Sequence, residues 1–326
     1  MQPETKARLI SAGSVDMDPE LVTWLTVPTA GPGAGNMAFF FCSEGHRVRL
    51  AIKKDSPLKA WMEGGQLVIT KDGMELARGS IEPELIHCPD QAFITMCEKC
   101  IFDCKFCPVP KLSGKVKTTD EMLGMIERAR VTGKMHAISI TSGVEISAEA
   151  EVSRAEELIK RLREIYSVPI GVSVYPTENS TRRLKSAGAD ELKYNVETMD
   201  RELHEKLCPD QDLEFILGSL KQGVSIFGRN RVCSNFIIGL GESDESAKRG
   251  IEELTSIGVV PILRAAAKHP LREKDVTVER PSAKRLLMLN RFLREKLDEY
   301  GLRADTFKTM CLPCTGCDIN PHSDLE

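Results

Sequence analysis

Apolar and polar residues alternate in two different ways along this chain, and the change falls near residue 90. Before it, residues 46–52 alternate with the period of a half-buried strand, and the runs at residues 66–70 and 74–81 predict further short strands. Asp72 and Gly73 separate the last two runs and favour a hairpin turn. The pattern predicts a β-rich N-terminal segment over residues 1–90.

After residue 90, strand-like and helix-like patterns follow each other in turn. Apolar runs predict strands at residues 92–96, 137–141, 169–175, 191–196, 232–240 and 259–263. Helical stripes lie between them; Thr118 and Glu121 form a capping box before the first, and residues 281–300 are also amphipathic. Such units build a parallel sheet, and these are fewer than a closed eight-fold barrel needs. The predicted fold is therefore α/β, a partial (β/α)6 TIM-type barrel over residues 91–300.

Two segments show little periodicity. Residues 29–35 are glycine-rich but lack the Lys-Ser/Thr pair of a phosphate-binding P-loop, and no helical pattern follows, so they are interpreted as a loop. Residues 301–326 form a C-terminal tail whose last part, from residue 309, has little core-forming sequence. We expect that part to need a bound metal for order.

Composition narrows the class of protein. The chain has 326 residues, enough for about two domains, and a formal charge of −4, which argues against a broadly basic nucleic-acid binder. No apolar run approaches the ~20 residues of a membrane helix, and the N-terminus lacks a signal-peptide core. We expect a cytoplasmic protein that binds neither membrane nor nucleic acid.

The unusual feature of the composition is the presence of 11 cysteines, six of which fall in two tight groups. The first group is Cys100, Cys104 and Cys107, and the second is Cys311, Cys314 and Cys317. In a cytoplasmic protein, clustered cysteines are more often metal ligands or catalytic groups than disulfides. Zinc is one alternative, but each group offers three close thiolates rather than the paired CxxC motifs of a structural zinc site. Three thiolates with one coordination position left open suit an iron–sulfur cluster better.

The first group, in the segment CIFDCKFC, resembles the CxxxCxΦC signature of the radical S-adenosylmethionine (SAM) superfamily, with Phe106 at the aromatic position Φ. The motif also follows the first barrel strand, as it does in that family. From spacing alone, a zinc or [2Fe–2S] loop is the alternative. The resemblance implies that Cys100, Cys104 and Cys107 hold a [4Fe–4S] cluster whose fourth iron binds SAM. It also implies reductive cleavage of SAM to a 5′-deoxyadenosyl radical, which abstracts hydrogen from an unreactive C–H bond.

Segments at later strand ends support the resemblance. Ser142, Gly143 and Glu145 are similar to part of the family's GGEP segment, which receives the amino group of SAM. The alternative for Glu145 is a solvated loop charge. Ser173 is a candidate for a ribose hydroxyl contact, although a core or surface role is the alternative for a lone serine.

Two further segments resemble those of biotin synthase-like and lipoyl synthase-like members. YNVET contains Asn195 and Glu197, whose polar side chains would contact SAM or substrate. The GLGE form follows Ile238, with Gly239 allowing close approach of the adenine and Ile238 packing on its face. An ordinary strand-to-helix turn is the alternative for the second segment. No residue is assigned a catalytic role beyond cofactor binding.

We interpret Cys311, Cys314 and Cys317 as ligands of a second iron–sulfur cluster, with zinc or a redox dithiol as alternatives. Its fourth ligand is left open between Cys97, Cys88, Cys42, an exogenous ligand and substrate. Cys208 and Cys233 are interpreted as core residues. His269 and His322 are lone histidines without a partner motif, so neither is assigned a role.

In this superfamily an auxiliary cluster serves as sulfur donor, substrate anchor or electron relay. The resemblance favours a lipoyl synthase-like enzyme that inserts sulfur into an octanoylated carrier protein. The β-rich start and C-terminal cysteines look like the two-component lipoyl synthases of archaea, which implies a paralogous radical SAM partner. A low-potential donor such as ferredoxin or flavodoxin would supply electrons.

The cysteine arrangement departs from ordinary lipoyl synthase, whose auxiliary cysteines precede the SAM motif. It also departs from biotin synthase, whose second cluster uses cysteines and an arginine within the barrel. The alternatives are therefore a radical SAM methylase, a peptide-modifying enzyme or a cofactor-maturation enzyme. A non-enzymatic iron–sulfur scaffold is a further alternative. Residues 1–90 are expected to cover the barrel mouth or dock a partner.

Overall fold

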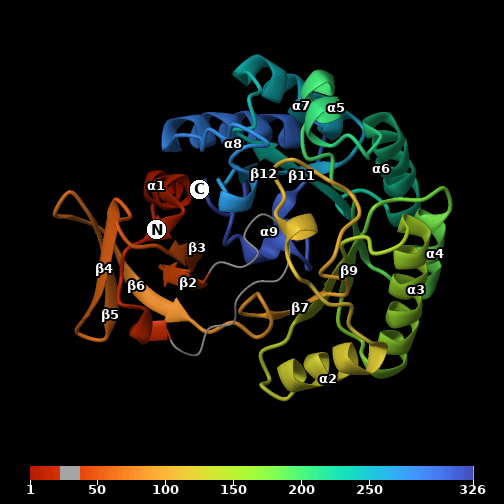
Figure 1. Ribbon diagram of the computed structural model, residues 1–326, viewed down its shortest axis with the longest axis horizontal. Coiled ribbons are helices and arrows are strands. Elements are labelled where there is room, and N and C mark those ends of the chain that lie inside the picture. The colour runs from red at the N-terminus through yellow and green to blue at the C-terminus, as the bar shows by residue number, and fades with distance from the viewer. Residues whose placement is uncertain (23–36, 326) are drawn as a thin grey trace.

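The computed structural model describes residues 1–22 and 37–325, which form two six-stranded sheets with the C-terminal tail between them (Figure 1). The predicted loop at residues 29–35 lies outside the described residues. Within the described part of the chain, no helix has both the length and the apolar content that a bilayer crossing requires.

The N-terminal sheet has the strand order β1-β3-β2-β6-β5-β4. Its strands are β1 (Ser14–Val15), β2 (Ala38–Ser43), β3 (His46–Ile52), β4 (Leu58–Glu63), β5 (Gln66–Lys71) and β6 (Met74–Glu82). The strands predicted from the alternating pattern are confirmed, as is the hairpin turn, where Asp72 and Gly73 both have positive φ. The sequence reading missed α1 (Pro3–Ala12), which buries Leu9 and Ile10.

The second sheet is parallel throughout, in the order β12-β11-β10-β9-β8-β7. Its strands are β7 (Gln91–Thr95), β8 (Ala137–Thr141), β9 (Ile170–Ser173), β10 (Glu191–Lys193), β11 (Val232–Ile238) and β12 (Val260–Ala265). The order follows the chain without a break, so each strand lies beside its predecessor. The predicted partial barrel is confirmed.

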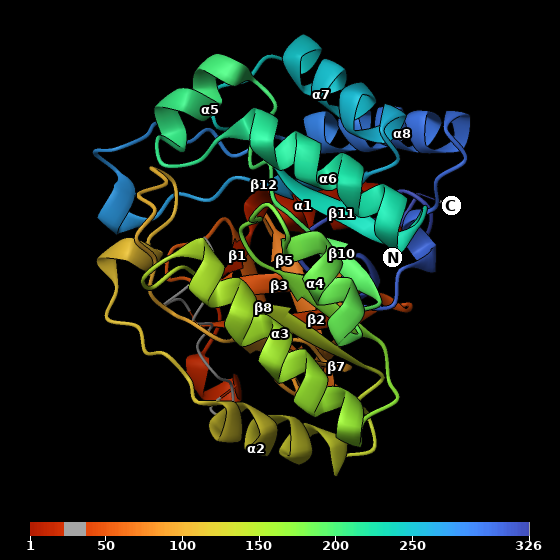
Figure 2. The same ribbon diagram turned by 90° about the vertical axis from the view of Figure 1, so that its right-hand side faces the viewer.

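Helices cover the outer face of this curved sheet (Figure 2). They are α2 (Thr119–Arg130), α3 (Ala148–Ile165), α4 (Ser180–Ala187), α6 (Leu213–Phe227), α7 (Asp244–Ser256) and α8 (Ala283–Glu299). Helix α5 (Arg201–Leu207) packs instead with Cys104 and Phe106. Short 3-10 turns are η1 (Pro19–Val22), η2 (Val109–Lys111), η3 (Pro270–Arg272) and η4 (Ala304–Thr306).

Local sequence explains where these helices begin. At α2 the Glu121 amide donates to the Thr118 hydroxyl and the Thr118 amide donates to the Glu121 carboxylate, which confirms the predicted capping box. The apolar stripe of α3, with Leu158 and Leu162 fully buried, packs onto the sheet. Because such stripes cover the outer face of the sheet, the inner face of the barrel is left for the cysteine-bearing segments.

The C-terminal tail is held by buried polar contacts at the amino ends of the barrel strands. Glu191, at the start of β10, accepts from the amide and hydroxyl of Thr309 at 2.9 and 2.6 Å. Gln91 and Ser139 accept from the Met310 amide at 2.7 and 2.8 Å. Satisfied buried hydrogen bonds therefore hold Thr309 and Met310 against the barrel, and the need of the cysteine-bearing tail for a bound metal stays a prediction.

The N-terminal sheet reaches the barrel through the tail and α8. Helix α1 packs against α8, and buried Lys6 pairs with Asp324 of the tail at 2.7 Å. The other carboxylate oxygen of Asp324 contacts the His46 ring nitrogen Nδ1 at 2.8 Å. The described part of the N-terminal segment, residues 1–22 and 37–90, thus contacts the tail and α8. The expected roles of this segment in covering the mouth or docking a partner stay predictions.

Candidate functional site

The first cysteine group lies in the loop that joins β7 to α2, at the carboxyl ends of the barrel strands. Two backbone bonds attach this loop to later segments: the Ile101 amide donates to the Val144 carbonyl at 2.7 Å, and the Lys105 amide to the Leu207 carbonyl at 2.8 Å. Carboxyl ends of parallel strands are where barrel enzymes place their active sites. The loop therefore occupies the expected position for a reactive centre.

The surroundings of these thiols are largely apolar. Cys104 and Phe106 pack with Leu207, Cys208 and Ile237 in one buried cluster. Burial raises the pKa of the Cys100 thiol and raises that of Cys107 to about 12. Thiolates in such a setting need a positive partner, which a metal ion supplies. The donor set and its environment fit an iron–sulfur cluster.

Arg272, just after β12, fixes the far side of the same loop. Its Nε donates to the Cys107 carbonyl at 2.7 Å, and its guanidinium pairs with Asp103 at 2.6 Å and Asp275 at 2.8 Å. The side chain is only 2% exposed. Sequence reasoning missed Arg272 because no motif surrounds it and its contacts span 165 residues.

The segment after β8 approaches the cysteine loop very closely. The Gly143 amide donates to the Cys97 carbonyl at 2.9 Å, and a Cβ at Gly143 would lie 2.1 Å from the Lys99 carbonyl oxygen. Only glycine leaves room for this approach. Next to it, the partly buried Glu145 carboxylate pairs with Lys99 at 3.2 Å. Glu145 thus lies beside the cysteine loop, where a solvated charge and a cofactor ligand are both compatible with its exposure.

The hydroxyl of Ser142 is already engaged in the structure. It donates to the buried Glu151 carboxylate at 2.7 Å, and the Glu145 amide approaches the same carboxylate at 3.3 Å. Glu151 also pairs with Arg154. Ser142 therefore shapes the turn that presents Glu145, through a buried carboxylate that sequence reasoning did not single out.

Ser173, Asn195 and Glu197 follow the next strands around the barrel. Ser173 ends β9 and is buried. Asn195 hydrogen-bonds the Glu197 side chain, and burial raises the pKa of Glu197 to about 7. Glu197 has a positive φ of 60°, a strained conformation for a residue with a side chain. A partly buried carboxylate that titrates near neutrality at a barrel mouth is typical of a functional group.

The turn after β11 is built around Gly239. Its φ is 107°, and a Cβ there would lie 2.2 Å from the Glu279 carbonyl oxygen. Glu242 closes the turn, since its carboxylate accepts from the amides of Gly239 and Leu240 at 2.7 and 2.9 Å. Ile238, assigned to an adenine contact from the sequence, is fully buried in the main core. The alternation of the strand instead directs Ile237 into the cluster around Cys104 and Phe106.

The second cysteine group lies inside the barrel, on and after the short helix α9 (Cys311–Cys314). The Cys311 sulfur is 3.6 Å from the Lys193 ammonium of β10. The Cys314 sulfur is 3.3 Å from that of Cys88, in the link between the two sheets. The Cys88 thiol donates in this contact, which lowers the pKa of Cys314 and raises the pKa of Cys88.

Charged side chains from the inner faces of the strands surround these thiols. Arg264 of β12 pairs with Asp318 of the tail at 3.1 Å, and the nearby Cys311 and Cys317 raise the pKa of its guanidinium. Burial and the neighbouring cations lower the pKa of His87 to about 3, so its imidazole is neutral. Lys193 and Arg264 were missed from sequence, although Arg264 is the single charge in an otherwise apolar strand, which is a signal for such a position.

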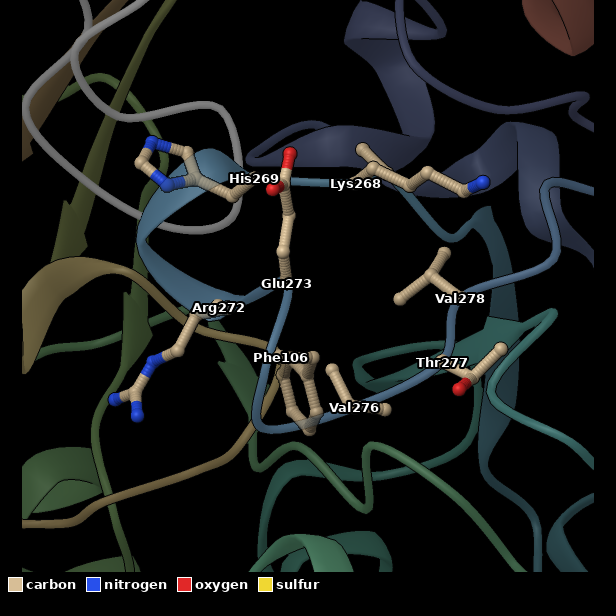
Figure 3. A pocket seen from close by; sticks show the side chains of 9 residues that line it. Phe106, Lys268, His269, Arg272, Glu273, Val276, Thr277 and Val278 are labelled. Carbon is tan, nitrogen blue, oxygen red and sulfur yellow. The ribbon is translucent and has the colours of Figure 1, made fainter.

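A cavity of about 250 Å³ opens beside the first cysteine loop (Figure 3). Phe106 forms one wall, and the segment after β12 forms the rest, including His269, Glu273 and Val278. In Figure 3 the Arg272 side chain extends away from the cavity, toward the loop that it fixes. The cavity gives a small molecule access to the aromatic position of the cysteine motif.

The structure thus brings the predicted residues into two neighbouring places. The first group, Gly143, Glu145 and Gly239 lie at the carboxyl ends of the strands, and the second group lies deeper in the barrel. Among residues 1–22 and 37–325, no three His, Cys, Asp or Glu side chains already converge as a metal centre. The assignment of ligands therefore stays a prediction that rests on position, spacing and charge.

Comparison with known proteins agrees with this arrangement. The sequence model of the family described as the radical SAM superfamily matches residues 94–254. A biotin synthase from Anaeromyxobacter dehalogenans is 30% identical over 178 residues, covering 50% of this chain and 47% of that protein. A lipoyl synthase from Caldanaerobacter subterraneus is 26% identical over 185 residues, covering 54% of this chain and 65% of that protein.

Solved structures share the fold. Methylornithine synthase superposes with a TM-score of 0.52 at 19% identity, covering 64% of each chain. A maturase of the [FeFe]-hydrogenase superposes with a TM-score of 0.51 at 14% identity, covering 64% of this chain and 51% of that one. The chain spans about half the length of the first biotin synthase, so these similarities concern the barrel rather than the whole molecule.

Proposed function

The chain belongs to the radical SAM superfamily, and from that premise we propose that it is a SAM-cleaving enzyme that inserts sulfur into an unactivated C–H position. The observation that carries the proposal is the pair of cysteine groups. One lies at the barrel mouth, beside glycine and carboxylate positions suited to SAM, and the other lies inside the barrel among cations. Relatives named biotin synthase and lipoyl synthase support sulfur insertion.

When bound, a [4Fe–4S] cluster and SAM supply a one-electron cleavage that yields methionine and a 5′-deoxyadenosyl radical. Cys100, Cys104 and Cys107 would hold this cluster. The Glu145 carboxylate, which pairs with Lys99 in this structure, would accept hydrogen bonds from the ammonium group of SAM. Gly143 keeps the backbone close to the loop, and Phe106 excludes water from its buried side.

Ser173, Asn195, Glu197 and the Gly239 turn are proposed to bind the remainder of SAM. Ser173 and Asn195 would hydrogen-bond ribose hydroxyls, and the Gly239 backbone would leave room for the adenine. Ile237 replaces Ile238 as the apolar contact, because it points toward the cysteine loop. Glu197, with a pKa of about 7, accepts a hydrogen bond when it is charged.

The sulfur source is proposed to be the second cluster, held by Cys311, Cys314 and Cys317. The substrate would be an octanoylated carrier protein, and a paralogous radical SAM chain would act with this one. Ferredoxin or flavodoxin would deliver the electron, in the cytoplasm. The alternative is a radical SAM methylase, peptide-modifying or cofactor-maturation enzyme whose second cluster relays electrons or anchors substrate.

Mass spectrometry of an anaerobic reaction tests the proposal. The reconstituted full chain is mixed with SAM, dithionite and an octanoylated lipoyl-carrier domain. We expect 5′-deoxyadenosine, a carrier that gains the mass of sulfur, and loss of sulfide from the enzyme. If 5′-deoxyadenosine forms while the carrier and the enzyme sulfide stay unchanged, sulfur insertion is wrong; absence of 5′-deoxyadenosine contradicts the SAM-cleaving activity itself.

A further inference from the structure

We propose that Cys88 is the fourth protein ligand of the second cluster, so that four thiolates close the site and no iron is left for substrate. This inference rests on the second cluster of the proposed function and specifies its ligand set. It selects one of several donors that the sequence leaves open.

The contacts of Cys88 distinguish it from the other candidate ligands, Cys97 and Cys42. The sulfurs of Cys88 and Cys314 lie 3.3 Å apart although 226 residues separate them in the chain, and both side chains are buried. Cys97 instead contacts the Lys99 carbonyl at 3.3 Å, beside the first cysteine loop. Cys42 pairs with Ser80 in the N-terminal sheet, next to the charges of Glu82 and Arg47. Of these three cysteines, all in the described part of the chain, Cys88 is the one that contacts the tail.

The charges around the site match an anionic centre. Four thiolates on a [4Fe–4S]²⁺ cluster carry a net charge of about −2, and buried charge requires compensation. Buried Lys193 lies 3.6 Å from the Cys311 sulfur, and Arg264 is close enough for Cys311, Cys314 and Cys317 to raise its pKa. A neutral disulfide between Cys88 and Cys314 would leave these cations without that compensation.

The spacing within the tail favours iron over zinc. Cys311, Cys314 and Cys317 follow each other as C-x2-C-x2-C, the spacing of three cluster ligands in bacterial ferredoxins. Structural zinc sites usually draw two pairs of ligands from separate segments. One distant cysteine is what a C-x2-C-x2-C segment needs to complete a cluster, and Cys88 supplies it.

Three residues next to these cysteines have a strained backbone. His87, Met310 and Thr315 all have positive φ, at 64°, 63° and 52°. Each is the immediate neighbour of one of the proposed ligands, Cys88, Cys311 or Cys314. Strained residues persist where the surrounding structure fixes them, and they concentrate at functional sites. The strain is consistent with short segments that wrap around one centre.

Closure of the site has two consequences. Cys88 lies in the link between the N-terminal sheet and the barrel, so a cluster held by Cys88 and the tail joins both sheets. A fully ligated cluster also has no free iron to anchor substrate, which leaves sulfur donation or electron relay as its role. These consequences distinguish a closed cluster from the SAM-binding one, whose three cysteines leave one iron open.

Iron content of the full chain tests the ligand set. In a background with Cys100→Ala, Cys104→Ala and Cys107→Ala, anaerobic reconstitution reports on the second site alone. We expect about four irons in this background. Adding Cys88→Ala leaves three thiolates, as at the first site, so iron should fall below about four per chain and one iron site should become distinct from the others in the Mössbauer spectrum. Adding Cys42→Ala is the matched control and should change neither the iron content nor the spectrum.

Equal iron and an unchanged Mössbauer spectrum in the Cys88→Ala variant would overturn the proposal, as would one zinc in place of iron. Oxidative mapping of the wild-type chain gives a reading that does not depend on a variant's folding. Mild oxidation should join Cys88 to Cys314 in metal-free protein, and iron loading should prevent it; a disulfide that forms equally in loaded protein contradicts the ligand role. Absence of 5′-deoxyadenosine in the wild type would instead contradict the proposed activity, whatever the iron count.

Discussion

Both cysteine groups are proposed to hold an iron–sulfur cluster, but one has apolar surroundings and the other has cationic surroundings. Cys100, Cys104 and Cys107 lie in one loop at the barrel mouth, among apolar side chains that raise the pKa of Cys100 and Cys107. Cys311, Cys314 and Cys317 lie deep in the barrel, beside Lys193 and Arg264. Apolar walls with an open side suit a cluster that must meet a ligand. Buried cations suit a closed anionic cluster that stays out of reach of solvent.

The comparison also shows how much of each site is local. The first group needs only one loop, fixed by Arg272 and Gly143, so its motif is complete in the sequence. The second group reaches completion only when residues from the link, β10, β12 and the tail meet. Variants that act on one site and spare the other are therefore the sharpest tests.

The largest effect is expected from Cys104→Ala. Loss of one ligand at the mouth should lower the formation of 5′-deoxyadenosine at least about 1,000-fold, since the group that delivers the electron is no longer held. Iron at the second site should remain, at about four per chain. Formation of 5′-deoxyadenosine under dithionite, measured beside a Cys42→Ala control, checks this; a native rate in the variant would contradict the assignment of the first site.

Gly143→Ala is expected to impair the first site without removing a ligand. A Cβ 2.1 Å from the Lys99 carbonyl oxygen must displace the cysteine loop, and a displacement of about 1 Å can cost about 100-fold in rate. The control is Gly218→Ala in α6, where a Cβ meets no atom within 4 Å. That control should stabilise the chain by about 0.5–1 kcal/mol. Similar rates in both variants would argue against the close approach.

Glu197, between the two sites, should make stability depend on pH. Burial raises its folded-state pKa to about 7, above the usual value of 4.5 for a glutamate, so the folded chain binds this proton more tightly. Stability from this group is complete at low pH and falls as pH rises from 4.5 toward 7. Relative to wild type, Glu197→Gln should gain about 2 kcal/mol between pH 5 and pH 8, allowing for partial exposure.

Urea unfolding of the metal-free chain at both pH values measures this difference. Glu214→Gln replaces an exposed carboxylate, 69% accessible, and serves as the control. If the free-energy difference between wild type and Glu197→Gln is the same at pH 5 and pH 8, the carboxyl does not titrate in this range.

The smallest effect concerns the charge of the second site. Arg264→Met removes a cation beside Cys311 and Cys317, and the reduced cluster carries more negative charge than the oxidised one. Its reduction potential should therefore fall by tens of millivolts, on the order of 1 kcal/mol. Redox titration in the background that lacks the first cluster measures it, with exposed Arg291→Met as control. A shift of the same size in both variants would place Arg264 outside the influence of the cluster.

Sequence patterns predicted the barrel well, because each strand and each amphipathic helix is encoded by its own residues. The capping box at Thr118 and the hairpin at Asp72 are local in the same sense, and both are confirmed. Helix α1 was missed because its apolar face is short and depends on packing against α8. Elements whose stability comes from a distant partner leave a weak signal in their own sequence.

The residues of the candidate site show the same difference between local signals and long-range contacts. Cys100, Cys104, Cys107 and Gly143 were found from motifs, because the chemistry needs those residue types at fixed spacing. Arg272, Lys193 and Arg264 were not, since each acts across the fold on a residue remote in sequence. Ile238 was chosen over Ile237 because the sequence alone does not say which face of β11 points inward.

The central claim is that one chain holds two iron–sulfur clusters of different character. Iron and sulfide analysis of anaerobically reconstituted protein, before and after replacement of Cys100, Cys104 and Cys107 by Ala, tests it most directly. We expect about eight irons in the wild type and about four in the variant. About four irons in the wild type and none in the variant would contradict it, and would remove the second cluster together with the case for sulfur insertion.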